Sequence, residues 1–208
     1  MKIKICGITN FEDAMACVDA GADLLGFNFC PGSPRYLSPA LAREIVSDLA
    51  GSILSVGVFV DHAQPHDVAR IADFVGLNAI QLHGDESPEY CRALRDRYVI
   101  KAFRLDKTFR PETARHYETD AILLDSFNIM NNGGTGKTFD WSLARFAKDL
   151  SPNLFLAGGL GPHNVSEAMK AVKPDAVDAC SKLEISPGRK DRALVKTFIE
   201  TVRKYEPS

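Results

Sequence analysis

A cysteine at residue 6 ends the first apolar run of the chain, within Lys4-Ile5-Cys6-Gly7-Ile8-Thr9. The strand-like run stops at Gly7 and a helix-start signal follows, so we expect the thiol at the mouth of a strand. Alternation along a strand places Lys2, Lys4 and Cys6 on one face, so two cations share that face with the sulfur. A nearby ammonium favours thiolate over thiol, which predicts a depressed pKa and a role in proton transfer or nucleophilic attack. The alternative is a small buried hydrophobe, the common role of a free cysteine.

A carboxylate ends another apolar run, Ala121-Ile122-Leu123-Leu124-Asp125. Alternation places Asp125 on the same face as Leu123 and Ala121, where desolvation would raise the pKa of the carboxyl and let it hold a proton. Asp125 is therefore a candidate general acid. An aspartate at the end of a strand can also cap the turn that follows, and this alternative stays open.

A rigid loop carries an arginine that is a candidate substrate clamp. The sequence Cys30-Pro31-Gly32-Ser33-Pro34-Arg35-Tyr36 contains two prolines and ends just ahead of a predicted helix. A guanidinium held on such a loop is suited to bidentate binding of a carboxylate, and the neighbouring aromatic ring can stack on a flat ligand. The alternative is a solvated surface arginine.

Two later segments predict a phosphate site. The first is Ala157-Gly158-Gly159-Leu160-Gly161-Pro162, and the second is Ser181-Lys182-Leu183-Glu184. Glycines let backbone amides approach a phosphate, and Lys182 adds a positive charge. We assign Gly158, Gly159, Ser181 and Lys182 to this role. A plain tight turn is the alternative for the glycine pair.

Two further motifs have weaker chemical meaning. His83 ends the run Ala79-Ile80-Gln81-Leu82-His83 and is a candidate for ligand contact, but no second histidine stands at metal-ligand spacing, so a hydrogen-bonded structural histidine is the alternative. The run Gly133-Gly134-Thr135-Gly136-Lys137-Thr138 resembles the end of a P-loop, but Asn131 occupies the place of its first glycine. A glycine loop that closes over Asp125, or an ordinary linker, fits this run better.

The composition limits the partners of the protein. The chain has 208 residues, 45% hydrophobic and 25% charged, which is typical of a soluble globular protein with one sizeable core, and we expect a single domain over residues 1–208. The net charge of -2 provides no broad basic surface for nucleic acid or for an anionic membrane. Any anionic ligand must therefore be held by local groups.

Cysteine usage and hydropathy favour the cytoplasm. The five cysteines (residues 6, 17, 30, 91 and 180) are odd in number and lack a Cys-x-x-Cys pair, which argues against a disulfide framework and against a zinc site. Residues 1–4 contain no signal-peptide core, and no stretch approaches roughly 18 uncharged apolar residues. We expect a protein without a membrane anchor.

Short apolar runs alternate with helix-patterned segments along the whole chain, and eight of them predict strands. These runs cover residues 2–6, 23–29, 53–60, 79–83, 99–104, 121–125, 154–157 and 176–180. Helix-start signals follow at Asn10, Ser38-Pro39, Ser87-Pro88 and Gly161-Pro162. Nearly continuous apolar strands in such alternation predict an α/β fold, a single (β/α)8 TIM barrel, whose chemistry lies at the C-terminal ends of the strands. A doubly wound open sheet is the alternative, but the chain lacks the glycine fingerprint after its first strand.

Several motifs agree in order and spacing with one known family. They are residues 4–9 (KICGIT), 26–29 (GFNF) with 33–36 (SPRY), 56–60 (VGVFV), 81–84 (QLHG), 124–126 (LDS), 133–136 (GGTG) with 139–141 (FDW), and 156–160 (LAGGL). Together they resemble phosphoribosylanthranilate isomerase of tryptophan biosynthesis. The resemblance extends from the first predicted strand to the last.

The resemblance implies a cofactor-free Amadori rearrangement of N-(5-phosphoribosyl)anthranilate to 1-(2-carboxyphenylamino)-1-deoxyribulose 5-phosphate. By this similarity Asp125 is the acid and Cys6 the base, while Arg35 binds the anthranilate carboxylate. The phosphate would lie near Gly158, Gly159 and Ser181, and the remaining substrate-binding candidates are His83, Leu160, Asp178 and Lys182. We expect a monomer or a homodimer that needs no metal.

The chain departs from the family pattern at residues 180–184, where Cys-Ser-Lys-Leu-Glu stands in place of the common Ser-Ser-Gly-Val-Glu. An ammonium at Lys182 would then replace a backbone contact. A histidine-pathway sugar isomerase on the same fold is a rival, but by similarity it has aspartate at the position of Cys6. A non-catalytic barrel that binds sugar phosphates is the rival from another class.

Overall fold

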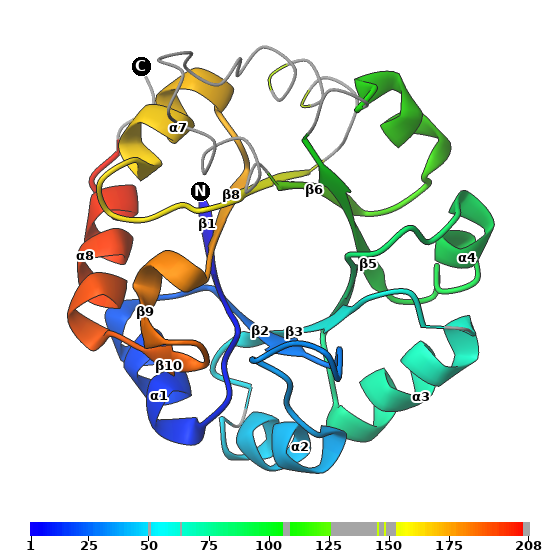
Figure 1. The fold of residues 1–208 in the computed structure, drawn as a ribbon, viewed down its shortest axis with the longest axis horizontal. Helices are drawn as coiled ribbons and strands as arrows, with labels where there is room; N and C mark the ends of the chain where they lie inside the picture. The colour runs from blue at the N-terminus through cyan, green and yellow to red at the C-terminus, as the bar shows by residue number, and fades with distance from the viewer. Residues whose placement is uncertain are drawn as a thin grey trace.

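Eight parallel strands form a closed barrel in the computed structural model, which describes residues 1–49, 51–62, 64–105, 109–125, 145, 148 and 153–205. Each strand pairs with the next along the chain, and β8 pairs with β1 to close the ring. Figure 1 looks along the barrel, with the strands as an inner ring and the helices outside it. The strands are β1 (Lys2–Cys6), β2 (Leu24–Asn28), β3 (Leu54–Phe59), β4 (Ala79–Leu82), β5 (Tyr98–Arg104), β6 (Ala121–Asp125), β7 (Leu154–Ala157) and β8 (Ala176–Ala179). This confirms the predicted (β/α)8 barrel and its strands, whose ends differ from the expected ones by no more than one residue.

Helices cover the outer face of the ring. They are α1 (Phe11–Ala20), α2 (Pro39–Asp48), α3 (Pro65–Val75), α4 (Pro88–Arg92), α7 (Val165–Val172) and α8 (Arg192–Arg203). The expected caps are present at three of them, because the side chains of Asn10, Ser38 and Ser87 accept hydrogen bonds from the backbone N–H groups of the first turn. Asn164 instead accepts from the N–H of Gly161 at 2.8 Å, so it fixes the loop that precedes α7.

Two segments differ from the predicted alternation. A 3-10 helix, η1 (Pro111–His116), follows β5 where a regular α-helix was expected. After β8 the chain forms a short 3-10 turn, η2 (Ser181–Leu183), and then a small antiparallel hairpin of β9 (Glu184–Ser186) and β10 (Arg189–Lys190). The hairpin was not predicted, because its strands are shorter than the runs that carry a periodic signal.

The barrel has two apolar layers. Outward-facing strand residues pack against the helices in the larger cluster. The smaller cluster fills the interior with Leu24, Val56, Ala79, Ile100, Ala102, Ala121, Leu123, Phe155, Ala157 and Ala176. Ala121 and Leu123 belong to this interior cluster, so Asp125 lies on the inward side of β6, as alternation predicts. Three polar side chains, those of Lys4, Gln81 and Asp178, are also buried on the inward side.

Within the described residues, no helix combines the length and the apolar character that crossing a membrane requires.

Candidate active site

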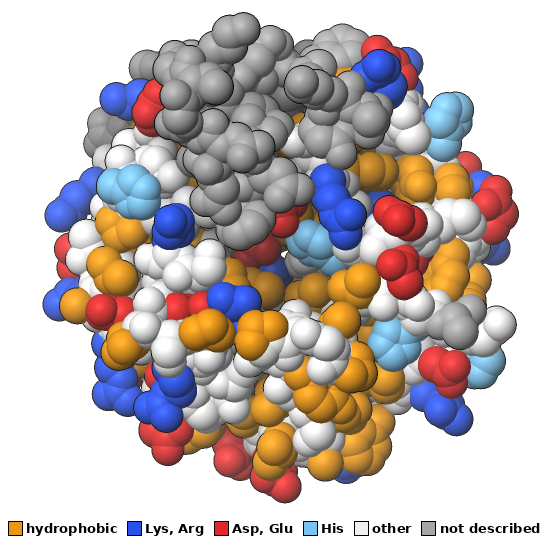
Figure 2. All heavy atoms as spheres, in the orientation of Figure 1, with side chains coloured by type: hydrophobic (Ala, Val, Ile, Leu, Met, Phe, Trp, Pro, Cys, Tyr) orange, Lys and Arg blue, Asp and Glu red, His pale blue; other side chains and the backbone are white. Residues whose placement is uncertain are grey.

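A cavity of about 300 Å³ lies at the C-terminal ends of the strands. Figure 2 shows this face of the molecule, which is hollowed near its middle and has charged and histidine side chains around the hollow. Eight of the residues predicted from the sequence line this one cavity: Cys6, Arg35, His83, Asp125, Gly158, Gly159, Asp178 and Ser181. They come from the ends of β1, β4, β6, β7 and β8 and from the loop after β2, so closure of the barrel brings distant parts of the chain together.

Cys6 is half-buried at the end of β1, and its surroundings lower the pKa of its thiol well below the usual value. The largest contribution is a hydrogen bond from the Cys180 thiol; burial opposes it, and the charges of Lys4 and Lys190 add to it. The predicted lowering of the pKa of Cys6 is therefore correct, but its leading cause is Cys180, the residue directly after β8. Lys2 plays no part, because its side chain is exposed and pairs with Asp23 at 3.5 Å. A separation of four residues along β1 takes it about 13 Å from the sulfur.

Lys4 and Asp178 form an ion pair inside the barrel, directly beneath Cys6. The two are register partners on β1 and β8, and Lys4 Nζ lies 2.8 Å from Asp178 Oδ2. Burial raises the pKa of Asp178 to about 7, against the attraction of Lys4. Asp178 Oδ1 is buried without a hydrogen-bond partner among the described residues. Asp178 thus lines the cavity, and one oxygen of its carboxyl has unused hydrogen-bonding capacity.

Asp125 is held by a histidine. His83 Nε2 lies 3.2 Å from Asp125 Oδ2, and Gln81 Nε2 lies 2.8 Å from His83 Nδ1. Because the Gln81 amide nitrogen faces Nδ1, it donates to that ring nitrogen, so Nε2 carries the proton and donates to Asp125 Oδ2. This hydrogen bond orients the Asp125 carboxyl, and it makes His83 a neighbour of Asp125 as well as of the cavity.

Arg35 is fixed by a carboxylate that the sequence analysis did not assign. Its Nε and Nη2 atoms donate to Glu184 at 2.9 and 2.6 Å, and Lys190 Nζ lies 2.9 Å from the same carboxylate. The hydrogen bonds to Glu184 raise the pKa of Arg35 further. Glu184 thus occupies one edge of the guanidinium, and the Nη1 edge has no partner among the described residues. Arg35 lines the cavity and keeps donors for an anion.

The predicted phosphate residues fall into two groups. Gly158 and Gly159 line the cavity with φ of 97° and 69°, a left-handed conformation that favours glycine, and Ser181 lies beside them. Asn164 donates to the carbonyl of Gly159 at 3.1 Å and holds this turn in place. Leu160 is instead buried in the apolar layer outside the barrel. Lys182 is exposed and does not line the cavity.

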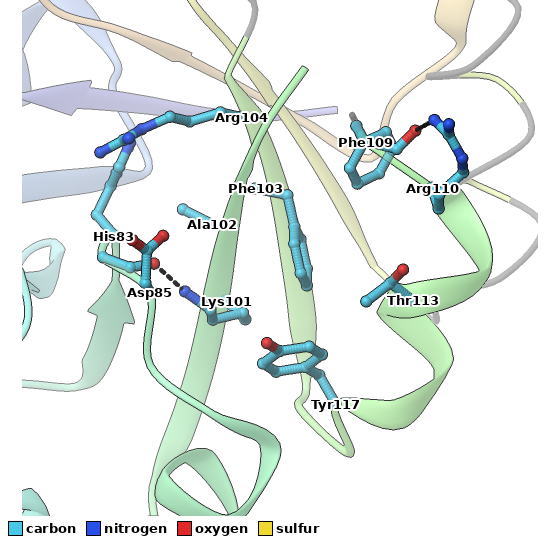
Figure 3. Close-up of a pocket in the computed structure, with 11 residues that line it drawn as sticks. His83, Asp85, Lys101, Ala102, Phe103, Arg104, Phe109, Arg110, Thr113 and Tyr117 are labelled. Carbon is cyan, nitrogen blue, oxygen red and sulfur yellow. Dashed lines mark hydrogen bonds between the residues drawn. The ribbon is translucent and has the colours of Figure 1, made fainter. Parts of the chain in front are cut away.

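A second cavity, of about 310 Å³, opens beside the first and shares His83 with it. Figure 3 shows its walls, with Phe103 and Tyr117 facing each other between β5 and η1. Lys101 points toward the chain that follows β4, where Nζ donates to the carbonyl of Gly84 at 2.6 Å and pairs with buried Glu86 at 2.8 Å. This buried ion pair fixes the backbone next to His83.

Some cavity residues were not found from the sequence as members of the site. Gly7, Asn28, Val58, Val60, Gln81, Ala157 and Cys180 also line the cavity. The sequence does contain a signal for Gln81 and Cys180. Gln81 is two positions from His83, and Cys180 is two positions from Asp178, so alternation places each on the same face as an assigned residue. For Glu184 and Lys190 no such signal exists, since the hairpin that carries them was not predicted.

Within the described ranges, no group of three or more histidine, cysteine, aspartate or glutamate side chains is arranged to hold a metal ion. The motifs at residues 133–136 and 139–141, Ser126 and the P-loop-like run at 133–138 lie outside the described residues.

The fold and the cavity define a class: a (β/α)8 barrel with a thiol, a carboxyl, a fixed arginine and a glycine turn around one pocket. The family model for N-(5'-phosphoribosyl)anthranilate isomerase matches residues 3–201, and the chain belongs to this family. It is thus an enzyme of the isomerase class.

Relatives support this assignment over the whole chain. The N-(5'-phosphoribosyl)anthranilate isomerase of Geobacter sp. (strain M21) is 47% identical over 203 residues, 98% of either chain. A crystal structure of monomers of the dimeric isomerase from Thermotoga maritima has a TM-score of 0.87 at 43% identity and covers 99% of this chain and 100% of that one. A crystal structure of the isomerase in complex with reduced 1-(o-carboxyphenylamino)-1-deoxyribulose 5-phosphate has a TM-score of 0.87 at 42% identity, with the same coverage.

Proposed function

We propose that this protein converts N-(5-phosphoribosyl)anthranilate to 1-(2-carboxyphenylamino)-1-deoxyribulose 5-phosphate, a step of tryptophan biosynthesis, by general acid and base catalysis. The observation that carries the proposal is the convergence of Cys6 and Asp125 on one cavity of about 300 Å³. The family membership and the solved complex of a relative with the reduced product support the choice of substrate.

The acid step falls to Asp125. Its carboxyl gives a proton to the furanose ring oxygen, the bond from C1 to that oxygen breaks, and the nitrogen lone pair of the anthranilate forms the protonated Schiff base. His83 orients the carboxyl through a hydrogen bond of 3.2 Å from its Nε2. General acids placed in this way contribute roughly 10²- to 10⁴-fold in rate.

The base step falls to Cys6. The positively charged Schiff base acidifies the proton on C2, so a thiolate is a strong enough base to remove it and leave the enolamine. Tautomerisation of the enolamine then gives the ketone. The lowered pKa of Cys6 supports this role, because it raises the fraction of thiolate at a given pH.

The two ends of the substrate are anionic, and each has a matching part of the cavity. Arg35 is positioned by Glu184 and presents its remaining N–H groups to the anthranilate carboxylate. The turn at Gly158 and Gly159, together with Ser181, offers backbone and hydroxyl donors to the phosphate. We include Asp178 in the substrate site because its unpaired oxygen can accept from a sugar hydroxyl. Leu160 supports the glycine turn by packing beneath it.

The proposal also covers the organisation of the protein. We propose a single domain over residues 1–208, with no need for a cofactor, acting on a small molecule and not on nucleic acid. The cytoplasm fits the five cysteines, all of which are free thiols. The Thermotoga maritima relative is dimeric, which makes a homodimer the first oligomeric state to test.

The direct test is turnover by the purified protein. Consumption of N-(5-phosphoribosyl)anthranilate is followed optically through its aromatic group, and the product is identified by NMR because substrate and product have the same mass. We expect activity in the wild type and its loss in Cys6→Ala and in Asp125→Asn, with cooperative melting kept in both. Wild-type activity in both variants would contradict the acid and base assignments, and binding without turnover in the wild type would favour the non-catalytic rival.

The histidine-pathway substrate is the control for specificity. An aminoimidazole carboxamide ribotide lacks the anthranilate carboxylate that Arg35 would bind. We expect its conversion to be slower by at least about a hundredfold in kcat/KM, since the charge-assisted hydrogen bonds between Arg35 and a carboxylate would be missing.

A further inference from the structure

The side chain of Cys180 has no role in the mechanism above, yet it faces the reactive sulfur. β1 and β8 pair in parallel with Lys4 opposite Asp178 and Ile5 opposite Ala179, so the next step of the register places Cys6 beside Cys180. The ion pair between Lys4 and Asp178 shows that side chains at these positions point inward together. Both sulfurs line the same cavity, and Cys180 is the leading cause of the lowered pKa of Cys6.

Each of the two sulfurs packs against a glycine. A Cβ atom at Gly26 would lie 2.6 Å from Cys6 Sγ, and one at Gly7 would lie 2.8 Å from Cys180 Sγ. Such distances are too short for real contacts, so each sulfur occupies space that a glycine leaves open. The observed positions of both sulfurs therefore depend on glycine at residues 7 and 26.

The Cys180 S–H group has one proton and two anionic acceptors within reach. One acceptor is Glu184 Oε1, to which Cys180 Sγ can donate at 3.7 Å, and the other is the Cys6 thiolate. Glu184 Oε1 already accepts from Arg35 Nε and from Lys190 Nζ, each at 2.9 Å. The carboxylate is thus satisfied without Cys180. Lys190 Nζ, 3.9 Å from Cys180 Sγ, donates toward the sulfur lone pairs and leaves the S–H free to donate to Cys6.

We propose that Cys180 is a positioning residue of the isomerase reaction, whose S–H group donates a hydrogen bond to the sulfur of Cys6 and keeps that sulfur in the thiolate form needed to take the C2 proton. The inference rests on the proposed function, because it assumes that Cys6 is the base. No proton is transferred along this hydrogen bond during the reaction. Cys180 acts through Cys6 and does not touch the sugar.

Other charged groups also face Cys6 and must stay constant in any test. They are Lys4 from β1, Asp178 from β8, Arg35 from the loop after β2 and Lys190 from β10, with His83 and Asp125 elsewhere on the wall of the cavity. Substitutions at residue 180 leave all of them in the chain. A change in the ionisation of Cys6 can then be assigned to the lost donor.

The experiment measures the ionisation of Cys6 in the full-length protein under a phosphine reductant. Wild type, Cys180→Ala and Cys180→Ser are alkylated with iodoacetamide from pH 5 to pH 10, and mass spectrometry follows the peptide that contains Cys6. We expect the alanine variant to move the midpoint up by about one pH unit, which slows alkylation about tenfold below the midpoint. The serine variant keeps an O–H donor, so its midpoint should stay within about 0.3 units of the wild type. Cys30→Ser, another half-buried cysteine, is the matched control and should change nothing.

Kinetics on the same variants separate the role of Cys180 as a hydrogen-bond donor from the role of Cys6 as the base. The acid limb of kcat/KM should move with the alkylation midpoint in Cys180→Ala, with KM nearly unchanged and the serine variant close to wild type. An alkylation midpoint unmoved by the alanine substitution overturns the role of Cys180, whatever the activity. If the alkylation midpoint moves but the pH profile of kcat/KM stays the same, Cys6 is not the base. That result also overturns the catalytic part of this inference.

A measurement on the wild type covers the case in which the alanine variant does not fold. The S–H stretching band of Cys180, identified by Raman difference against Cys180→Ser, should shift to lower frequency as Cys6 ionises, because an S–H bond weakens when it donates to an anion. A band that stays constant across the ionisation of Cys6 overturns the proposal.

Discussion

The imidazole of His83 and the carboxyl of Asp125 meet at the cavity, with Nε2 3.2 Å from Oδ2, although β5 lies between β4 and β6 in the barrel. Gln81, two residues before His83, contacts the other ring nitrogen at 2.8 Å. The Asp125 carboxyl is therefore oriented by a side chain that is itself oriented. In this arrangement the loss of the histidine should affect the chemical step more than the binding of substrate.

His83→Ala should lower kcat by roughly tenfold to a hundredfold, since the Asp125 carboxyl would lose the hydrogen bond that orients it. KM should change by less than about threefold. Steady-state kinetics with purified protein provide the measurement, and His66→Ala, an exposed histidine on α3, is the matched control. An unchanged kcat in His83→Ala would show that the contact is structural only.

The ionisation of Cys6 predicts the acid limb of the pH profile. In the proposed mechanism the thiolate is the active form and the pKa of Cys6 is lowered, so kcat/KM should be level above that lowered pKa and fall about tenfold per pH unit below it. In Cys6→Asp the base is a carboxylate with a reference pKa of about 3.9, so the limb should move to lower pH while the rate drops. Stopped assays from pH 4 to pH 9 test this, and an acid limb identical in both proteins would assign it to another group.

Arg35→Ala should raise KM by about tenfold to a hundredfold, because the substrate carboxylate would lose a bidentate charged partner. An analogue built on aniline lacks the carboxylate and therefore isolates that contact. For this analogue, Arg35→Ala should raise KM by less than about threefold. Equal losses on both substrates would mean that Arg35 acts through Glu184 and the β9–β10 hairpin and not through the ligand.

Lys182→Ala tests whether an exposed ammonium contributes to phosphate binding. Since Lys182 lies outside the cavity wall, solvent screens its charge, and we expect KM to rise by no more than about threefold at low salt. The effect should vanish near 0.5 M salt, roughly where the screening length falls below about 5 Å. A salt-independent loss of about tenfold or more would show that the side chain reaches the phosphate directly.

The buried pair of Lys101 and Glu86 predicts a stability effect outside the chemistry. Lys101→Met would leave the Glu86 carboxylate buried with only backbone donors, which should lower the free energy of unfolding by about 3 to 5 kcal/mol. Urea denaturation followed by circular dichroism measures this. Asp73→Asn, which breaks the exposed pair with Arg97, is the control and should have little effect. Equal midpoints for Lys101→Met and wild type would contradict a structural role for the pair.

The barrel was predictable because each strand carries its own local signal. Apolar runs with short turns define all eight strands, and capping side chains such as Ser38 and Ser87 mark helix starts within the same few residues. Seven of the eight predicted residues that line the cavity followed from one further rule, that chemistry in such barrels lies where the strands end, and Asp178 followed from the family resemblance. Alternation also placed Asp125 correctly on the inward side.

The pairings inside the site were not predictable in the same way. Glu184 contacts Arg35 across 149 positions of sequence, and nothing in either local run indicates the other. The same holds for Cys180 and Cys6, which become neighbours only when β8 closes against β1. Lys182 and Lys2 were given weight for their charge, yet the structure places both side chains in solvent, where a charge has little influence on the pocket.

The seam between β1 and β8 has a consequence for the synthesis of the protein. The first strand leaves the ribosome long before the last, and Asp178, Cys180 and Lys190 are made only when nearly the whole chain exists. Until then Cys6 is an ordinary thiol. Its heightened reactivity begins when the ring closes, so the rate at which this single sulfur is labelled during translation or refolding reports the completion of the barrel.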